Sequence, residues 1–238
     1  MAVQLWLTRH GETKYNIEGV VQGIVNSDLT ETGAKDAQAL GRGFAKDDVT
    51  FDAAYSSDLQ RAADTAQIAL AAAHIDIPVT QMAGLREQNF GMFDGGPESQ
   101  RQGALEDMLG KAGIRNLKSL NMKQMVELVH ILDKHNGHGH AESVHTSVGR
   151  FNDAMLKIAK TAEEKHQDNA FVVAHGAIIW LWLNSIGMPD SAKFIKNVAV
   201  SKVMYTDKGF TLLKYNDRKY VEAGGGTKDV PAESYPLD

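Results

Sequence analysis

Three adjacent residues near the start of the chain are of types that could form a reactive site. Arg9, His10 and Gly11 follow directly after the apolar run "AVQLWLT" of residues 2–8. An arginine guanidinium is a planar fork of donors that suits the oxygens of a phosphoryl group. A neutral histidine can act as a nucleophile when an acceptor fixes its second ring nitrogen. The triplet alone is a weak motif, so it predicts a site only if other segments supply partners.

Three further segments carry partners of a suitable type. Arg61 lies in "AYSSDLQRAADTA", Glu87 lies in "LREQNFGMFDG", and His175-Gly176 repeats the His-Gly step after "FVVA". Each residue alone has an ordinary explanation as a solvated charge, a surface carboxylate or a structural hydrogen-bonding group. Their recurrence at the ends of apolar runs favours a shared site.

The surrounding segments predict an α/β fold. Apolar runs at 2–8, 51–57, 77–81 and 169–175 are typical of buried strands, and helical patterns follow within 27–48, 59–73 and 176–187. Thr30 and Asp58 are the expected N-caps of the first two helices. Residues 198–206 and 210–216 predict a hairpin or strand pair. Alternation of strands and helices predicts a doubly wound, mostly parallel sheet with helices on both faces.

The pattern changes between about residues 97 and 141. Strand signals vanish there, and two helical runs remain, at 98–113 and 119–135. We interpret this segment as a helical cap insertion that selects substrate, within a single domain spanning residues 1–238. A long amphipathic helix at 142–166 then returns to the core. The Gly- and Pro-rich tail after about residue 222 is expected to be loose.

This fold would bring the candidate residues together. In an open α/β sheet, ligands bind beyond the carboxyl ends of the strands. The segments that end there carry Arg9, His10, Arg61, Glu87 and His175.

Composition narrows the classes of partner. The 238 residues carry a net charge of -5 and no lysine or arginine block, which argues against a nucleic-acid or anionic membrane surface. The absence of cysteine removes disulfides, thiolate nucleophiles and Cys-based zinc sites. The N-terminus does not match a signal peptide, and the longest apolar stretch, 177–183, is too short for a bilayer. We expect a cytoplasmic protein that binds anions in a local pocket. The sequence does not decide between a monomer and a homodimer.

Five segments resemble one known family, in the family's order. "LTRHGETKYN" is similar to the opening motif of the histidine phosphatase superfamily, in the branch of cofactor-dependent phosphoglycerate mutases and broad-specificity phosphatases. The helix, arginine, glutamate and second-histidine motifs of that family resemble "LTETGAKDAQALG", "AYSSDLQRAADTA", "LREQNFGMFDG" and "VVAHGAIIW". The 97–141 insertion has no match.

The resemblance implies phosphoryl transfer from a small phosphorylated substrate through a phosphohistidine at His10. A backbone carbonyl near Gly11 would hold the His10 tautomer, with glycine allowing a tight bend. Glu87 would protonate the leaving alkoxide, which requires a raised pKa. The charge of the phosphoryl group would be stabilised by Arg9, Arg61 and His175, so no metal or other cofactor is required.

Secondary contacts to phosphate are also implied. Asn16 and Gln22 match amide positions that hold phosphate in the family, and Gly23 lies beside them. For Gln22 and Gly23, loop polarity and a turn are equally good explanations. Gly176 and Ala177 open a predicted helix, so their N–H groups are expected to face an anion.

Departures from the mutase pattern favour a phosphatase of the histidine acid type. The family's mutases carry an Arg-His-Tyr-Gly run after the glutamate and an Arg pair in the insertion, whereas this chain has "EQNFG" and no Arg-Arg. The cations of the insertion are dispersed, at Arg101, Lys111, Arg115 and Lys118. The alternative is a cofactor-dependent phosphoglycerate mutase. A binding module without chemistry would require the loss of His10, Glu87 or His175.

One further cluster invites a metal interpretation. The segment "HNGHGHAESVH" holds His135, His138, His140 and His145. Their spacing is irregular, and no carboxylate or cysteine set completes a site. We therefore predict a polar loop at the mouth of the active site and no metal.

Overall fold

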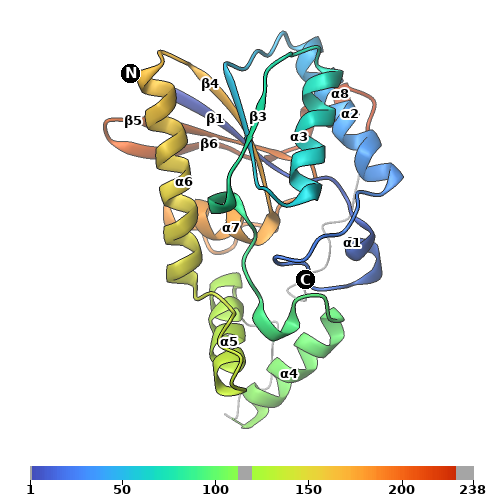
Figure 1. Cartoon of the computed structure of the whole chain (residues 1–238), viewed down its shortest axis with the longest axis vertical. Helices are drawn as coiled ribbons and strands as arrows, with labels where there is room; N and C mark the ends of the chain where they lie inside the picture. The colour runs from blue at the N-terminus through green and yellow to red at the C-terminus, as the bar shows by residue number, and fades with distance from the viewer. Residues whose placement is uncertain (1, 112–119, 229–238) are drawn as a thin grey trace.

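A six-stranded sheet forms the centre of the computed structural model, which describes residues 2–111 and 120–228 (Figure 1). The strand order is β3-β2-β4-β1-β5-β6. The four strands β1 to β4 are parallel, β5 pairs antiparallel with β1, and β6 pairs antiparallel with β5. In chain order the strands are β1 (Val3–Arg9), β2 (Ala53–Ser56), β3 (Val79–Gln81), β4 (Asn169–Ala174), β5 (Val200–Thr206) and β6 (Gly209–Asp217). The predicted mostly parallel α/β sheet and its terminal hairpin are confirmed.

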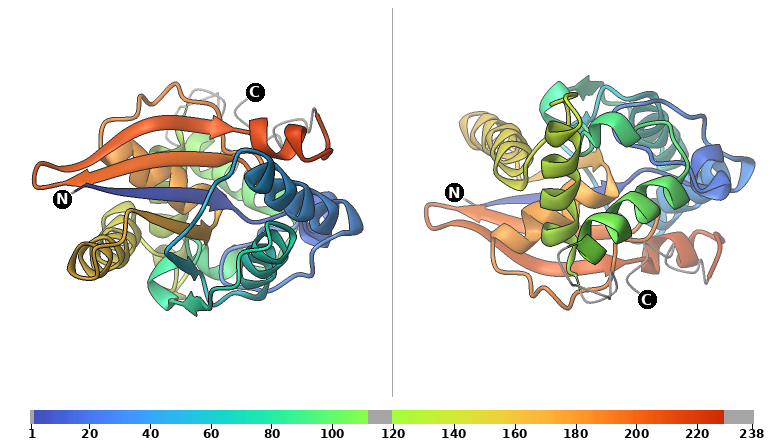
Figure 2. Two further views of the ribbon diagram at one scale, coloured as in Figure 1. Left: turned by 90° about the horizontal axis from the view of Figure 1, so that it is seen from above. Right: turned by 90° about the horizontal axis from the view of Figure 1, so that it is seen from below.

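Helices cover both faces of this sheet, as Figures 1 and 2 show. One face carries α2 (Glu31–Lys46), α3 (Gln60–Ala72) and α8 (Lys219–Ala223), and the other carries α6 (Val144–Glu164) and α7 (Gly176–Ser185). Side chains alternate along β1, so Trp6 packs against Phe44 of α2 while Leu5 and Leu7 join the opposite core. Both faces of the sheet are therefore buried, as a parallel sheet requires.

The helix caps were only partly predicted. Thr30 caps α2 by accepting a hydrogen bond from Gly33 N. Asp58 does not cap α3, because its carboxylate binds the Arg86 guanidinium through two charge-assisted bonds of 2.6 and 2.7 Å. The short helix α1 (Lys14–Glu18), which follows a capping box at Thr13, was also missed.

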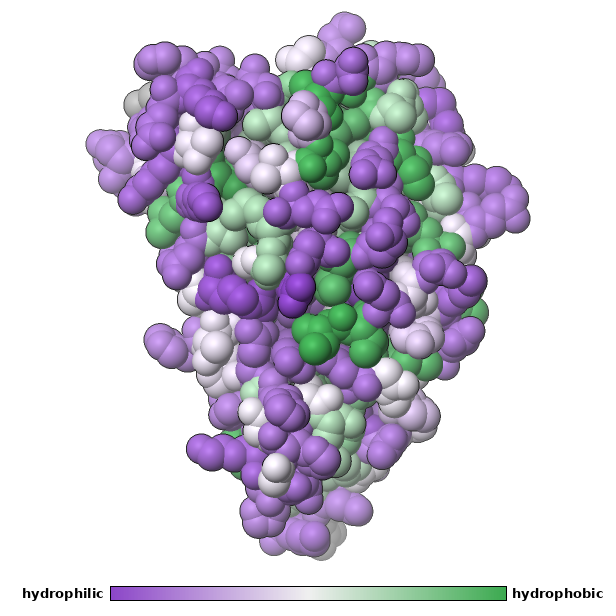
Figure 3. All heavy atoms as spheres, viewed as in Figure 1, coloured by the Kyte–Doolittle hydropathy of each residue, from purple (hydrophilic) through white to green (hydrophobic). Residues whose placement is uncertain are grey.

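The insertion forms two helices, α4 (Glu98–Lys111) and α5 (Met122–His135), at the lower end of Figure 1. The face of this end seen in Figure 3 is mainly hydrophilic, and most of its large apolar side chains are buried. The inward residues belong to the same hydrophobic cluster as α6 and α7; among them are Leu105, Leu109, Met122, Met125 and Val129. Arg115 and Lys118 lie outside the described residues.

The segment between α8 and residue 227 is held against the core, whereas the sequence predicted a loose tail after about residue 222. Thr227 donates through its backbone N–H and its hydroxyl to the buried Asp36 carboxylate. Arg218 pairs with the same carboxylate at 3.0 Å. A buried ion pair with these hydrogen bonds holds the chain against α2. Among the described helices, none combines the length and apolarity that a bilayer crossing requires.

Candidate active site

Parallel strand pairing brings the two His-Gly steps side by side. Arg9 of β1 stands opposite Ala174 of β4, and His10 N donates to Ala174 O at 3.0 Å. The residue that follows each strand is a histidine, so His10 and His175 lie at the same sheet edge. The His10 and His175 rings are buried, with centroids 5.2 Å apart. The sheet register itself assembles this half of the site.

The surroundings of His10 define its tautomer. Its Nδ1 lies 2.7 Å from the carbonyl oxygen of Gly11, which can only accept, so Nδ1 carries the proton and Nε2 keeps its lone pair. Burial first, then Arg61 and Arg9, hold the pKa of His10 well below its ordinary value. The ring is thus neutral at neutral pH, as a nucleophile must be.

Gly11 is required by packing, not by an unusual bend. A Cβ at this position would lie 2.7 Å from the Gly33 carbonyl oxygen at the start of α2, and the Gly11 backbone has no positive φ. Gly11 N donates to the Thr65 hydroxyl of α3 at 2.9 Å. The loop after β1 is consequently fixed between two helices.

Two buried arginines supply positive charge beside the histidines. Arg9 donates from Nη1 to Ile195 O at 2.9 Å, and Arg61 donates from Nη1 to Val25 O and from Nη2 to Gly23 O, both at 2.7 Å. Arg61 thereby also fixes the loop that follows α1. The charges of both arginines reach the histidines, since each lowers their pKa values.

His175 differs from His10 in having no acceptor for its ring. Within residues 2–111 and 120–228, neither of its buried ring nitrogens has a hydrogen-bond partner. Burial, with Arg61 and His10, holds the pKa of His175 well below its ordinary value. Since buried polar groups in proteins are nearly always bonded, such a ring suits contact with a ligand.

Glu87 is held by backbone amides. Its Oε1 accepts from Gln88 N at 2.9 Å and from Ile178 N at 2.8 Å, and its Oε2 accepts from Ala177 N at 3.0 Å. Burial raises the pKa of Glu87, and these N–H groups oppose the shift. A carboxyl with a raised pKa keeps its proton to higher pH than an ordinary glutamate and can then donate it.

This arrangement corrects the interpretation of the α7 N-terminus. The Ala177 N–H donates to a carboxylate of the protein itself, so it is not directed at a phosphate. Gly176 has a steric role, because a Cβ there would lie 2.5 Å from Phe194 Cζ and 3.1 Å from Arg9 Nε. The N–H groups of Ala177 and Ile178 at this helix N-terminus bind the Glu87 carboxyl instead.

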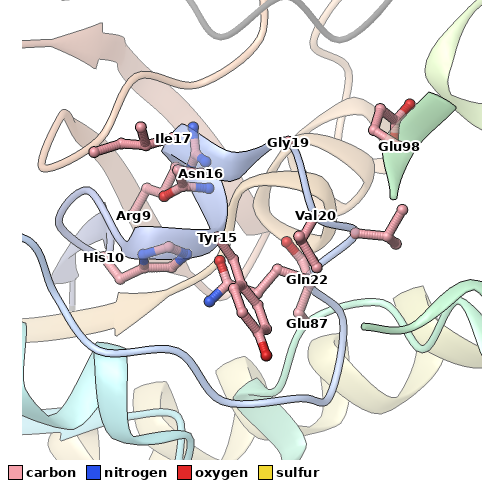
Figure 4. A pocket seen from close by; sticks show the side chains of 11 residues that line it. Arg9, His10, Tyr15, Asn16, Ile17, Gly19, Val20, Gln22, Glu87 and Glu98 are labelled. Atoms are coloured by element: carbon pink, nitrogen blue, oxygen red, sulfur yellow. The ribbon is translucent and has the colours of Figure 1, made fainter. Parts of the chain in front are cut away.

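A cavity of about 210 Å³ opens in front of Arg9, His10 and Glu87, whereas Arg61 and His175 lie buried behind its lining (Figure 4). In this view Arg9 and His10 lie on one side of the cavity, and Gln22 and Glu87 lie on the other. The described residues that line it are Arg9, His10, Tyr15, Asn16, Ile17, Gly19, Val20, Val21, Gln22, Glu87 and Glu98.

The secondary phosphate contacts divide into two groups. Gln22 has its Oε1 bound by the Thr13 hydroxyl at 2.9 Å, and its buried Nε2 has no partner in the described part of the chain, so this amide can donate into the cavity. Asn16 also lines the cavity, although its Oδ1 accepts from Thr13 N in the capping box. Gly23 does not face the cavity, because its N–H donates to Asp94 at 2.7 Å.

Asp94 was not singled out in the sequence. Its carboxylate accepts from Gly23 N and Ile24 N, so it fixes the same loop that Arg61 binds from the other side. Burial raises the pKa of Asp94 to about 6. Asp94 lies in the glutamate segment "LREQNFGMFDG", but nothing in its spacing indicated that it binds the loop at Gly23 and Ile24.

The histidine-rich segment forms no metal site in the residues that the structure covers. The side chains of His135, His138 and His140 are exposed. The loop is organised instead by the buried Asp133, whose carboxylate accepts backbone N–H groups from His140 and Met92.

Known proteins resemble this chain throughout its length. A family model described as "Histidine phosphatase superfamily (branch 1)" matches residues 5–218. A metal-independent phosphoserine phosphatase of Arabidopsis thaliana is 28% identical over 223 residues, 93% of this chain and 84% of that protein. A 2,3-bisphosphoglycerate-dependent phosphoglycerate mutase of Bartonella tribocorum is 38% identical over only 96 residues, 40% of this chain and 47% of the mutase.

The same relationship holds in three dimensions. The crystal structure of a phosphoglycerate mutase from Bacillus anthracis str. Sterne is similar with a TM-score of 0.85 and 30% identity, covering 94% of this chain and 96% of that one. The fold, the order of the motifs and the extent of the family match agree. The chain belongs to branch 1 of the histidine phosphatase superfamily.

Proposed function

We propose that the protein hydrolyses small phosphomonoesters through a phosphohistidine at His10. In the first step His10 Nε2 attacks phosphorus, the ester P–O bond breaks, and the departing alkoxide takes a proton from Glu87. In the second step water attacks phosphorus, gives a proton to Glu87, and the P–N bond breaks. Inorganic phosphate leaves, and both side chains return to their starting states.

One observation carries this proposal: a histidine fixed as a nucleophile and a protonatable carboxyl line the same cavity. Their pKa values are shifted in opposite directions, that of His10 down and that of Glu87 up. Both shifts favour the combination that the first step needs, a deprotonated nucleophile and a protonated acid. The lowered pKa of His10 keeps the nucleophile deprotonated to lower pH, which supports an acid-type phosphatase.

The remaining polar groups suit the charge of the phosphoryl group. Arg9 lines the cavity and Arg61 adds positive charge from behind it, and the neutral His175 ring and the Gln22 amide provide donors. With these donors in place, the reaction requires no metal.

The cavity favours a hydrolase over a mutase. Among the described residues, its lining includes one arginine and no lysine. Arg101 of the insertion is buried and binds the Glu98 carboxylate through Nε at 2.9 Å, and Lys111 lies at the end of α4. No cation from the described part of the insertion thus lines the cavity to bind a substrate carboxylate. The alignment of a phosphoserine phosphatase over 93% of the chain supports the same choice.

A phosphoglycerate mutase is the second candidate, since the fold of one such enzyme matches this chain closely. Steady-state hydrolysis of a panel of phosphomonoesters, with isomerisation of 3-phosphoglycerate followed in parallel, decides between the two. We expect hydrolysis to be the faster reaction for at least one ester. Isomerisation faster than every hydrolysis would overturn the proposal. Cytoplasmic location, the single domain and a homodimer stay predictions from the sequence.

A further inference from the structure

The segment that carries Glu87 has little regular structure of its own. It runs from the end of β3 to the start of α4 and contains only two single-turn 3-10 helices, at Ala83–Leu85 and Gly91–Phe93. No strand pairing fixes it near Glu87. A proton donor must nevertheless lie within hydrogen-bond reach of the leaving oxygen. The contacts that hold this segment therefore bear on the reaction.

Arg150 of α6 binds the segment with its whole guanidinium group. Nη1 donates to Gly84 O and to Arg86 O, both at 2.9 Å, and Nη2 donates to Glu87 O at 3.2 Å. Nε and Nη2 also donate to the two oxygens of Glu142, at 2.9 and 2.8 Å. All five N–H donors of the arginine are thus in use.

Glu142 holds the other side of Glu87. Its Oε2 accepts from Asn89 N at 3.1 Å, its backbone N donates to Asn89 O at 3.0 Å, and its carbonyl accepts from Gln88 Nε2 at 2.6 Å. Bonds from the Arg150–Glu142 pair therefore reach the residues on both sides of the acid.

The position of α6 makes this contact possible. Its buried residues Phe151, Met155 and Ile158 anchor the helix in the core. Gly84 lies so close to the helix that a Cβ there would be 2.8 Å from Ala154 Cβ. The segment rests directly on α6, and the Arg150 side chain binds the carbonyls within reach.

We propose that Arg150 is a positioning residue for proton transfer by Glu87. Arg150 does not line the cavity, and its donors go to the backbone of the acid segment and to Glu142. It acts on the reaction through the placement of Glu87. This inference rests on the proposed role of Glu87 as the general acid. Displacement of a catalytic group by about 1 Å costs on the order of 100-fold in rate, so loss of the clamp has a measurable effect.

A double-mutant cycle tests this coupling. The variants are Arg150→Met, Glu87→Gln and both together, and kcat/KM is measured for phenyl phosphate and for p-nitrophenyl phosphate. p-Nitrophenolate departs without a proton, whereas the more basic phenolate gains from one. We expect Arg150→Met to lower kcat/KM for phenyl phosphate by about 10- to 100-fold and to change p-nitrophenyl phosphate much less. In the Glu87→Gln background, Arg150→Met should lower kcat/KM by less than about threefold.

Lys157→Met is the matched control, because Lys157 is an exposed cation two turns further along α6. It should leave both substrates at wild-type rates. Losses that multiply in the double variant, or equal losses on both esters, would show that Arg150 only supports the fold, and the inference would be wrong. If Glu87→Gln itself slows both esters equally, the general-acid role fails instead.

If Arg150→Met does not fold, two more conservative variants, Glu142→Gln and Arg150→Lys, test the same proposal. Glu142→Gln retains the size of the side chain but turns one acceptor toward Arg150 into a donor. We expect the same selective loss on phenyl phosphate, several-fold in size. Arg150→Lys should show it as well, since lysine provides three donors from one point and cannot reproduce the fork. Wild-type selectivity in both variants would refute the proposal.

Discussion

The two sides of the active-site cavity are positioned in different ways. The histidine side, with Arg9, His10 and His175, continues two paired parallel strands and takes its position from the backbone ladder. The acid side, with Glu87, lies on an irregular segment that the half-buried Arg150–Glu142 ion pair holds in place, while backbone N–H groups bind the Glu87 carboxyl itself. Backbone pairing persists when one side chain is replaced, whereas the Arg150–Glu142 ion pair is lost when either side chain is replaced. The two sides should therefore respond differently to substitution.

The largest effect is expected at His10. His10→Ala removes the nucleophile, so turnover of every ester should fall to background, while strand pairing keeps the fold. Rates on two esters and a thermal melt check both parts. A variant that keeps near wild-type activity would exclude His10 as the nucleophile.

Glu87→Gln should come next. Loss of general-acid catalysis costs about 100- to 10,000-fold for alkyl phosphates, because an alkoxide leaves poorly without a proton. p-Nitrophenyl phosphate should be slowed far less. Equal slowing of both substrates would assign Glu87 to binding or to activation of water.

The pH profile should reflect both sides of the cavity. His10 acts when deprotonated, and its pKa is lowered, so kcat/KM rises with pH only in the acid range. Glu87 acts when protonated, and its pKa is raised, so kcat/KM falls again as pH rises through that value. Glu87→Gln should remove the falling limb for the same ester. An unchanged limb would mean that another group titrates there.

A smaller effect is expected from the side-chain support on the histidine side. Asn197 donates from Nδ2 to His10 O at 3.0 Å and is buried. Asn197→Ala should cost about 1–3 kcal/mol of stability, since the carbonyl loses a partner. Because the ladder still holds His10, kcat/KM should fall by less than about tenfold, and equally for all esters. A loss larger than that of Arg150→Met would reverse the comparison of the two sides.

The smallest effect concerns stability and Asp94. The folded-state pKa of Asp94 is raised from 3.8 to about 6. Its contribution to stability is therefore present below the unfolded-state pKa and is lost as pH rises through about 6. The difference in unfolding free energy between the wild type and Asp94→Asn should shrink from about pH 4 to about pH 7. Denaturant titrations at both pH values test this, and a difference that grows with pH would contradict it.

The same contrast explains what the sequence could reveal. Short apolar runs predicted the strands, and parallel strands place their carboxyl ends at one edge, so the proximity of His10 and His175 followed. The Thr30 cap was readable because its partner is three residues away. These features depend on local pattern and on sheet geometry.

The acid side could not be derived in this way. Arg150 and Glu142 look like solvated charges on an amphipathic helix, and their partners lie more than 50 residues earlier in the chain. The cap at Asp58 failed for the same reason, because Arg86 offered a stronger partner. Long-range choices between competing charged partners are not encoded in spacing.

The phosphohistidine is the central claim, and one measurement addresses it most directly. Enzyme in excess is mixed with a phosphomonoester, quenched in base on the millisecond scale, and digested for mass spectrometry. The account predicts an acid-labile, base-stable phosphoryl group on the peptide that contains His10, appearing before inorganic phosphate is released. A phosphoryl group on a different residue, or release of inorganic phosphate at full rate with no phosphoenzyme at any quench time, would contradict it.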